Sequence, residues 1–374
     1  GLARIRTADI VFGGELVFSV GGYDPPDRSD PSNPGSIERT PVERPTTTGI
    51  PVPMVMGGTR FLVGDNSYLA VGLGFYHSMG GGTSYDKAKV TTEGLVKSMT
   101  ALLEIAPAIA YQVHERIFIG ATLRVGIGVF SALQSCSELL NCTHEEPGRP
   151  IYDTKVSTMT GAGAGYSLGI QVLPAPWIGL GLTYRSNLDV KVSGRNVLRT
   201  ATGTTFDAEV KLPFPQSLTA GVFARVHKRV LLAGQIGWVD SSRFREIYLD
   251  VEGWSYGNEA LRIPLRMRDC FQGHLGIEIL AHRMLLLRAG AAYDSPAIPR
   301  RLTTRSLPDT HKMAWDLGFT ILAGRWRFDL AAEAYLGDLK TGFQPRVVAA
   351  GTTAETRYLP GGTISIHLAG GVAW

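Results

Sequence analysis

Charge is scarce in this sequence. Charged residues make up 19% of the 374 residues, below the usual quarter, and the net charge is only +4 with both signs scattered along the chain. A continuous basic face for nucleic acid therefore has no support. Apolar residues still make up 44%, which excludes a disordered chain, and glycine is unusually frequent at 45 residues.

A long apolar run able to form a membrane helix is also lacking. The longest uncharged stretch covers residues 156–184, but four glycines and then Pro174 and Pro176 interrupt it. Glycine costs about 1 kcal/mol and proline about 3 kcal/mol inside a helix, so two strands around a proline turn fit this stretch better. The first residues lack the apolar segment of a signal peptide, and we expect the sequence to describe a mature or trimmed chain.

Cysteine is rare, with three residues in all. Cys136 and Cys142 lie six residues apart in a polar segment, which predicts a disulfide that closes a loop in an oxidising compartment; two unpaired thiols are the alternative. No cysteine and histidine spacing is typical of a zinc site, and GxGxxG, P-loop and HExxH motifs are absent. We therefore expect neither a metal nor a cofactor.

One enzyme-like motif is present. Residues 165–169 match GxSxG, whose serine acts as a nucleophile only on a strand-to-helix turn. Ser167 falls in the middle of an expected strand with no helix after it. A membrane-embedded esterase would also need a Ser–His–acid cluster that we cannot assemble from the sequence, so we expect a protein that is not an enzyme.

What the sequence does contain is alternation of apolar and polar residues with a period of two, the pattern of β-strands. In residues 270–279, for example, Phe271, Leu275 and Ile277 alternate with polar residues such as His274 and Glu278. The same alternation recurs in residues 117–130, 315–323, 328–338 and 363–374. A soluble sandwich would turn the apolar face inward, whereas a membrane barrel would turn it toward lipid.

Three features favour the membrane barrel. The connections alternate between very short turns, such as His114-Glu115 and His282-Arg283, and long segments, such as residues 21–51 and 134–160. The face opposite the apolar one mixes glycine with charges of both signs, as a polar lumen does. Aromatic residues gather near strand ends, as interface girdles do; these are Tyr111, Trp177, Tyr184, Trp238, Tyr293, Trp315, Trp326 and Trp374.

The runs predict fourteen antiparallel strands in one all-β barrel with short periplasmic turns and long extracellular loops. They lie near 8–20, 53–64, 68–79, 99–113, 117–132, 161–173, 178–194, 206–226, 230–250, 262–281, 285–294, 312–324, 328–340 and 361–374. The count is even, as single-chain bacterial barrels require, and closure leaves no unpaired sheet edge in hydrocarbon.

Four segments in this order resemble the FadL-type outer-membrane transporters. They are Ile105–Tyr111 followed by Ile117–Gly120, Pro176–Ser186 followed by Gly194, Leu212–Pro213 leading to Leu218–Val222, and Leu287–Pro296. The resemblance covers roughly residues 50–374, and Trp374 resembles the aromatic end signal of outer-membrane barrels.

The resemblance implies a fourteen-stranded barrel in the Gram-negative outer membrane that takes up long-chain fatty acids, related lipids or aromatic hydrocarbons. Substrate passes from an extracellular groove to a lumen pocket and leaves sideways at a kink in the third strand. The family plugs its lumen with an N-terminal hatch, but only Gly1–Thr7 precede the first strand here. We therefore expect residues 1–374 to form a single barrel domain with the hatch absent from this chain.

Candidate ligand-binding residues come from two sources. By strand parity, Met54, Met56, Leu62, Tyr76 and Phe223 face inward, where apolar side chains suit a ligand pocket. Leu133, Leu139 and Leu140 lie in the loop that resembles a groove-forming loop of the family; packing within that loop is the alternative.

Inward-facing arginines are a further possibility, because arginine binds carboxylates with two parallel hydrogen bonds. Arg124 is the candidate for a ligand headgroup, together with Arg60, Arg185, Arg225 and Arg288. For most of them we favour pairing with Glu278, Asp316, Asp329 and Glu333 across the lumen.

A lateral gate is predicted where the third strand runs into Gly80, Gly81 and Gly82, because glycine permits bulges and weakens the ladder. An ordinary loop start is the alternative.

The expected function is passive transport of hydrophobic small molecules across the outer membrane, with membrane lipids around the barrel and no nucleic acid as a partner. The alternative is a FadL-like barrel that serves as a structural subunit of a cell-envelope complex. Its protein partner would bind through the extracellular loops, such as the proline-rich segment Asp24–Pro53, or through the lumen.

Overall fold

The structure is a computed structural model. It describes residues 8–24, 28–29, 37–38, 50–63, 67–85, 94–135, 153–199, 205–253, 262–299, 309, 311–337, 342–343 and 356–373. Among these residues the only helical element is the short 3₁₀ turn η3 (Ser241–Arg243). No helix in this part of the chain is both long and apolar enough to cross a bilayer.

Strands make up nearly all of the described chain. In the first half they are β1 (Ala8–Asp24), β2 (Arg28–Ser29), β3 (Ile37–Glu38), β4 (Ile50–Val63), β5 (Ser67–Ser84), β6 (Gly94–His114), β7 (Ile117–Ser135), β8 (Asp153–Ala175), β9 (Ile178–Arg185) and β10 (Leu188–Arg199). The second half contains β11 (Thr205–Phe214), β12 (Ser217–His227), β13 (Val230–Val239), β14 (Glu246–Val251), β15 (Arg262–Pro264), β16 (Cys270–His282), β17 (Leu285–Asp294), β18 (Lys312–Ala323), β19 (Trp326–Gly337), β20 (Gly342–Phe343) and β21 (Thr356–Ala373).

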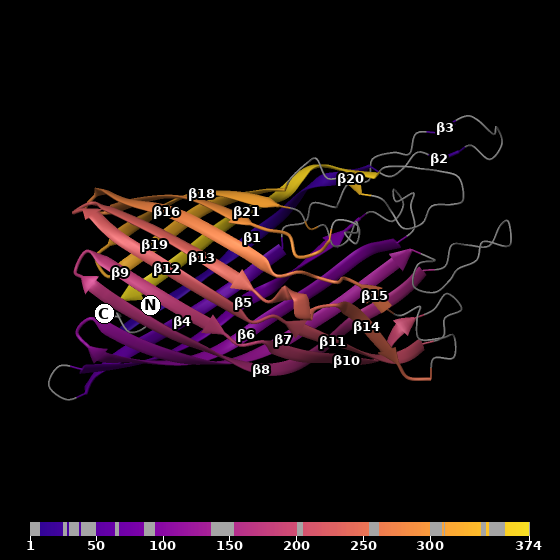
Figure 1. The fold of residues 1–374 in the computed structure, drawn as a ribbon, viewed down its shortest axis with the longest axis horizontal. Coiled ribbons are helices and arrows are strands. Elements are labelled where there is room, and N and C mark those ends of the chain that lie inside the picture. The colour runs from indigo at the N-terminus through magenta and orange to yellow at the C-terminus, as the bar shows by residue number, and fades with distance from the viewer. Residues whose placement is uncertain are drawn as a thin grey trace.

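These strands close into a fourteen-stranded antiparallel barrel, as predicted (Figure 1). Four of the fourteen are long strands interrupted near their middle: β9 with β10, β11 with β12, β13 with β14, and β15 with β16. The barrel closes where β1 pairs with β21 on one side and with β4 on the other. Closure satisfies the backbone hydrogen bonds around the wall, except toward the extracellular ends of β4 and β5, where their ladder stops.

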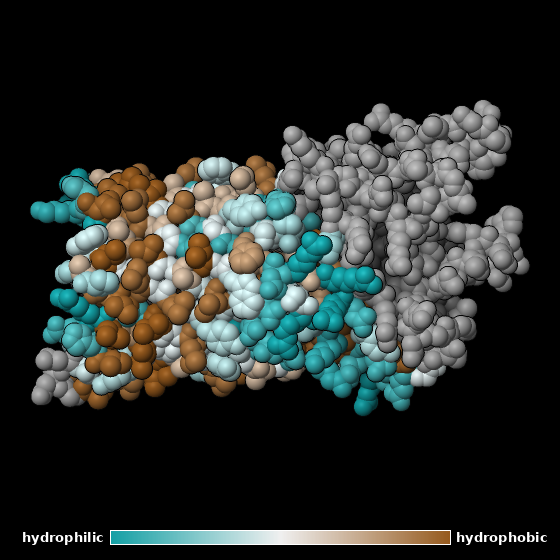
Figure 2. All heavy atoms as spheres, viewed as in Figure 1, coloured by the Kyte–Doolittle hydropathy of each residue, from teal (hydrophilic) through white to brown (hydrophobic). Residues whose placement is uncertain are grey.

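The apolar face of the barrel points outward. Leu275, Ile236 and Leu317 are each about 70% exposed, at 71%, 70% and 69%, while their neighbours Gln235, His274 and Asp316 line the inside. On the face drawn in Figure 2, brown hydrophobic residues gather over the end of the barrel away from the grey atoms. Because a soluble sandwich would bury such side chains, the barrel is built for lipid, with its polar face around the lumen.

The two ends of the barrel differ as the sequence predicted. Two-residue turns join β6 to β7, β8 to β9, β12 to β13, β16 to β17 and β18 to β19. The other end carries the long connections, which place it outside the cell. Strands also extend further toward this end than expected, because β5 reaches Ser84 and β6 already begins at Gly94.

Beyond the lipid-facing band, one wall of the barrel folds inward. Strand β9 ends at Arg185 and β10 begins at Leu188. The break between them reverses which residues of the chain face the inside of the barrel. Leu188, Val190 and Val192 of β10 are completely buried against Gly126 and Gly128 of β7. The extracellular half therefore holds an apolar core between β6, β7 and β8 on one side and β10, β11 and β14 on the other.

The outer face of this extracellular sheet is polar. Lys191 Nζ lies 2.7 Å from Glu209 Oε2, and Lys211 Nζ lies 3.3 Å from Asp189 Oδ2. Figure 2 shows teal residues gathered over the same strands, next to the brown band. This part of the barrel thus protrudes from the membrane into water.

Candidate functional site

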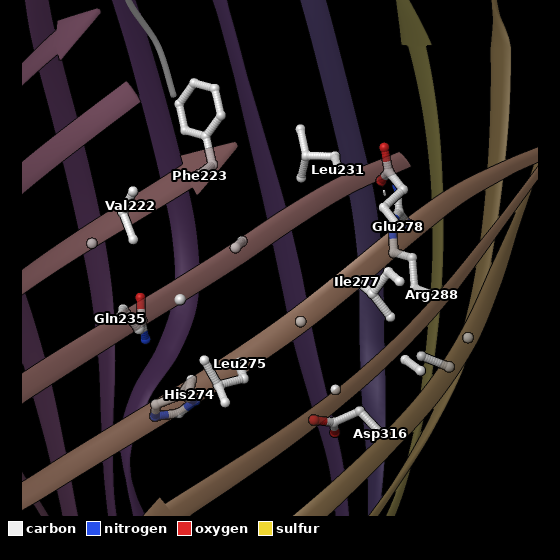
Figure 3. Close-up of a pocket in the computed structure, with 18 of the residues that line it drawn as sticks. Val222, Phe223, Leu231, Gln235, His274, Leu275, Ile277, Glu278, Arg288 and Asp316 are labelled. Carbon is white, nitrogen blue, oxygen red and sulfur yellow. Dashed lines mark hydrogen bonds and ion pairs between the residues drawn. The ribbon is translucent and has the colours of Figure 1, made fainter. Parts of the chain in front are cut away.

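The membrane-spanning half of the barrel contains a lumen cavity of about 740 Å³. Phe223 of β12, Gln235 of β13, His274 of β16 and Asp316 of β18 lie around it (Figure 3). Most of its exposed lining is apolar, and Gln235, His274 and Asp316 add polar groups to it. A cavity of this volume that combines apolar surface with polar groups is typical of a small-molecule site.

One wall of the cavity carries an ion-pair network. Arg288 Nε lies 2.8 Å from Glu278 Oε2, and Figure 3 shows the two side chains together. Arg288 Nη1 donates to Asp329 Oδ1 at 3.1 Å and to Thr320 Oγ1 at 2.7 Å. The expected pairing of Arg288 with Glu278 and Asp329 is therefore present, and it compensates the charge of this arginine within the wall.

A second network lies between the cavity and the apolar core. Arg124 donates to both oxygens of Glu104, from Nε at 2.9 Å and from Nη2 at 2.5 Å, and from Nη1 to the Ser186 carbonyl at 2.8 Å. Arg185 Nη2 donates to Glu104 Oε1 at 2.9 Å, and the Tyr76 hydroxyl donates to Glu104 Oε2 at 3.3 Å. Glu104 is completely buried and Arg124 is 4% exposed, so this pair is shielded from water.

This network corrects the arginine partners expected from the sequence. Arg124 and Arg185 pair with Glu104 of β6, which was not among the four expected acids. Arg60 lies with its guanidinium carbon 4.1 Å from the centre of the Tyr68 ring, as in a cation–π contact. Glu104 was not singled out from the sequence, because neighbouring strands bring these side chains together only at the observed register.

The ladder between β4 and β5 ends before either strand does. Met54 and Tyr76 are the last pair toward the extracellular end, and residues 50–53 of β4 pair only with β1. Residues 77–84 of β5 pair with β6 and have no β4 partner among the described residues. The register of β5 against β6 also shifts between His77 and Met79, which marks a bulge at Ser78.

The three glycines predicted as a gate lie just beyond this bulge. Gly80 has a φ of +134°, which side chains rarely adopt. Gly80, Gly81 and Gly82 stay paired with β6, so they keep one ladder while the side toward β4 is open. Gly81 has open space where a side chain would project. Their role as a gate stays a prediction.

The predicted ligand residues fall in several places. Phe223 lines the lumen cavity. Met54 and Met56 pair with Tyr76 and Gly74 and so share the inward face of β5, and Leu62 has the same parity. Tyr76 and Arg124 belong to the Glu104 network and not to the cavity lining. Ligand binding by these residues stays a prediction.

Several predicted features lie outside the described part of the chain. These are Gly1–Thr7, Leu139, Leu140, Cys136, Cys142, Trp374 and most of the segment Asp24–Pro53; the side chain of Leu133 is likewise not described. Ser167 of the GxSxG motif lies within β8, where it pairs with Thr122 and Arg185, in the middle of a strand as expected.

Comparison with protein families gives one match. A family model described as outer membrane protein transport protein (OMPP1/FadL/TodX) matches residues 41–332. No curated protein matches the chain in sequence.

Solved structures are similar in fold. A Pseudomonas aeruginosa FadL homologue has a TM-score of 0.80 at 15% identity, covering 100% of this chain and 91% of its own. The Ralstonia pickettii toluene transporter TbuX gives 0.65 at 13%, covering 100% and 92%. The P. putida toluene transporter TodX gives 0.69 at 15%, covering 99% and 90%.

Proposed function

This chain belongs to the outer membrane protein transport family (OMPP1/FadL/TodX), and we propose that it carries hydrophobic small molecules across the outer membrane by passive diffusion. The observation that carries this proposal is the lumen cavity of about 740 Å³, most of whose exposed lining is apolar beside the polar side chains of its wall. Such a cavity suits a small molecule with a large apolar part. Long-chain fatty acids and aromatic hydrocarbons are the candidate substrates.

The residues of the cavity suggest how a substrate is held. The Phe223 ring offers an apolar contact, and the Arg288 network keeps the opposing wall electrically compensated. Because Arg288 is bound to two carboxylates, its charge is already compensated. We therefore expect the cavity to select by shape and apolar contact more than by the charge of a headgroup.

We further propose that substrate leaves the barrel sideways between β4 and β5. Three observations support this exit: the ladder stops at Met54 and Tyr76, β5 bulges at Ser78, and Gly81 borders open space. A sideways exit delivers an apolar molecule directly to the hydrocarbon of the membrane. The molecule then does not pass through water, where exposing its apolar surface would cost about 25 cal/mol of free energy for each Å².

Uptake measurements test transport directly. In a strain that lacks the gene, we expect the unchanged chain to restore uptake of labelled oleate, labelled toluene or both. Restoration of neither substrate by a correctly assembled barrel would overturn the transport proposal.

The exit is tested by a bulky substitution at the gap. We expect Gly81→Trp to reduce the initial rate of uptake to near that of the empty strain, because the indole occupies the open space beside the unpaired edge. Gly273→Trp in β16 is the control for adding an indole elsewhere on the barrel, since a side chain there also meets open space but faces lipid, far from β4 and β5. Equal rates in the two variants would rule out the β4–β5 exit and leave transport itself untouched.

A further inference from the structure

A second cavity lies on the outside of the barrel, on its lipid-facing surface. It measures about 490 Å³ and crosses strands β5 to β9. Its walls include Ile109 and Tyr111 of β6, Ile119 of β7, Ile170 of β8 and Leu182 of β9, all on the outward face. Nearly all of its lining is apolar. The surface therefore has a groove where most of the barrel has a continuous cover of large side chains.

Small residues create this groove. Its floor is formed by Ala121, whose methyl group faces outward from β7, and by the backbone of Ala110, Gly120 and Gly169. Larger residues flank the floor on neighbouring strands. The resulting trough has the chemistry of an acyl-chain site, because it offers only hydrocarbon to its occupant.

The groove lies close to the periplasmic turns. Ile119 is three residues from Arg116, a distance of about 10 Å along a strand. Arg116 belongs to the turn between β6 and β7, and its Nη1 donates to the Pro174 carbonyl of the next turn at 3.3 Å. This bond holds the guanidinium at the ends of β7 and β8, the two central strands of the groove.

Arg116 has capacity for an anion. Its side chain is exposed, carries five N–H donors, and makes only the bond to Pro174 within the described residues. Lys228, Arg229 and Arg283 are likewise exposed in the other described periplasmic turns. Among the two-residue turns at this end, the only acid is Glu115, which directly precedes Arg116. The periplasmic rim is therefore basic, in contrast to the paired lysines of the extracellular sheet.

We propose that the groove and Arg116 together bind one anionic phospholipid of the inner leaflet, with phosphatidylglycerol as the representative. The acyl chain lies along Ile119 and Ile170, and the phosphodiester accepts hydrogen bonds from Arg116, which binds phosphate in a two-point geometry. Lipopolysaccharide is excluded as the occupant because its phosphates lie in the outer leaflet, whereas Arg116 lies in a periplasmic turn. An uncharged hydrocarbon would use the groove but gain nothing from Arg116.

Native mass spectrometry of the purified barrel in detergent tests the site, with phosphatidylglycerol and diacylglycerol of equal chain length as probes, because diacylglycerol has the acyl chains but no phosphate. We expect one phosphatidylglycerol to bind more tightly than diacylglycerol. Arg116→Gln should weaken phosphatidylglycerol binding about tenfold, since a hydrogen bond to a charged group is lost, and leave diacylglycerol nearly unchanged. Ala121→Phe should fill the groove and weaken both lipids.

Two matched controls separate this site from general attraction. Lys228→Gln removes a rim charge away from the groove, and Ala332→Phe adds the same ring to the lipid face of β19. Both should leave binding as in the unchanged chain. Equal losses of phosphatidylglycerol binding in Arg116→Gln and Lys228→Gln would overturn the proposal.

A measurement on the unchanged chain guards against variants that fail to fold. The preference for phosphatidylglycerol should shrink when NaCl is raised from about 0.1 M to about 1 M, because salt screens exposed charges over a shorter distance. A preference that is absent at low salt, or that is unaffected by salt, contradicts a phosphate bound by Arg116.

Discussion

At the scale of single residues, Glu104 is a buried charge that depends on all of its hydrogen-bond partners. It is completely buried and accepts hydrogen bonds from Arg124, Arg185 and Tyr76, which come from three different strands. A buried charge is tolerated only when it is fully compensated, and removing one partner leaves the others unpaired in a dry site. The network thus ties β5, near its bulge, to β7 and β9.

Glu104→Gln should destabilise the barrel by about 3–5 kcal/mol, because Arg124 loses its carboxylate partner while it remains buried. The free energy of unfolding from phospholipid vesicles in urea measures this. Glu278→Gln is the control: its partner Arg288 is 43% exposed and retains Asp329, so a loss below about 1 kcal/mol is expected. Similar losses in the two variants would contradict the special burial of Glu104.

Residue-level predictions from the sequence succeeded where alternation alone decided them. The inward parity of Phe223 and Met56 follows from a period of two, and the register of the strands agrees with it. Side-chain partners on neighbouring strands were harder to predict, as the Arg124–Glu104 pair shows. A contact between two strands depends on their relative register and not on either sequence segment alone.

At the scale of elements, β8 explains why glycine is so frequent. A Cβ at Gly161 or Gly163 would collide with the backbone carbonyls of Lys191 and Asp189, so β10 approaches β8 too closely for any side chain. Gly169, further along the same strand, has its nearest neighbours at 3.7 Å and no such restriction. Glycine thus occurs in β8 for two different reasons. Strand β10 approaches β8 closely at one end, and β8 borders the open lumen at the other.

Gly161→Ala should cost about 1–3 kcal/mol of unfolding free energy, since β10 must shift to admit a methyl group. Gly169→Ala should be neutral or stabilise by up to about 1 kcal/mol, because alanine restricts the unfolded chain without meeting a neighbour. The same urea titration compares them. A larger loss at Gly169 than at Gly161 would contradict the close approach of β10.

The sequence alone did not predict that β10 and β11 fold inward. Residues 178–194 and 206–226 were each predicted as one strand, but each is interrupted, at Ser186-Asn187 and at Pro215-Gln216. Each interruption reverses which residues face inward, so a single alternation over the whole run assigns one half wrongly. Valines 190 and 192 therefore form part of an apolar core inside the barrel.

At the scale of the whole molecule, the outcome depends on which face meets lipid. The sequence predicted fourteen strands and their turns because both follow from local alternation and turn residues. It also predicted the outward apolar face, from the contrast between short and long connections. The open edge between β4 and β5 needed the structure, since it arises from how far two ladders extend and not from either strand's composition.

Arginine substitutions distinguish a lipid-facing surface from a water-facing one. Leu317→Arg places a charge in the middle of the lipid-facing row of β18, where it should cost about 2–4 kcal/mol of unfolding free energy in vesicles. Gln235→Arg puts the same charge into the lumen, and a change within about 0.5 kcal/mol is expected there. On a water-exposed surface, a leucine that is 69% exposed would accept arginine at little cost. Equal tolerance of both substitutions would therefore place water on both sides of the barrel wall and remove the basis for a membrane transporter.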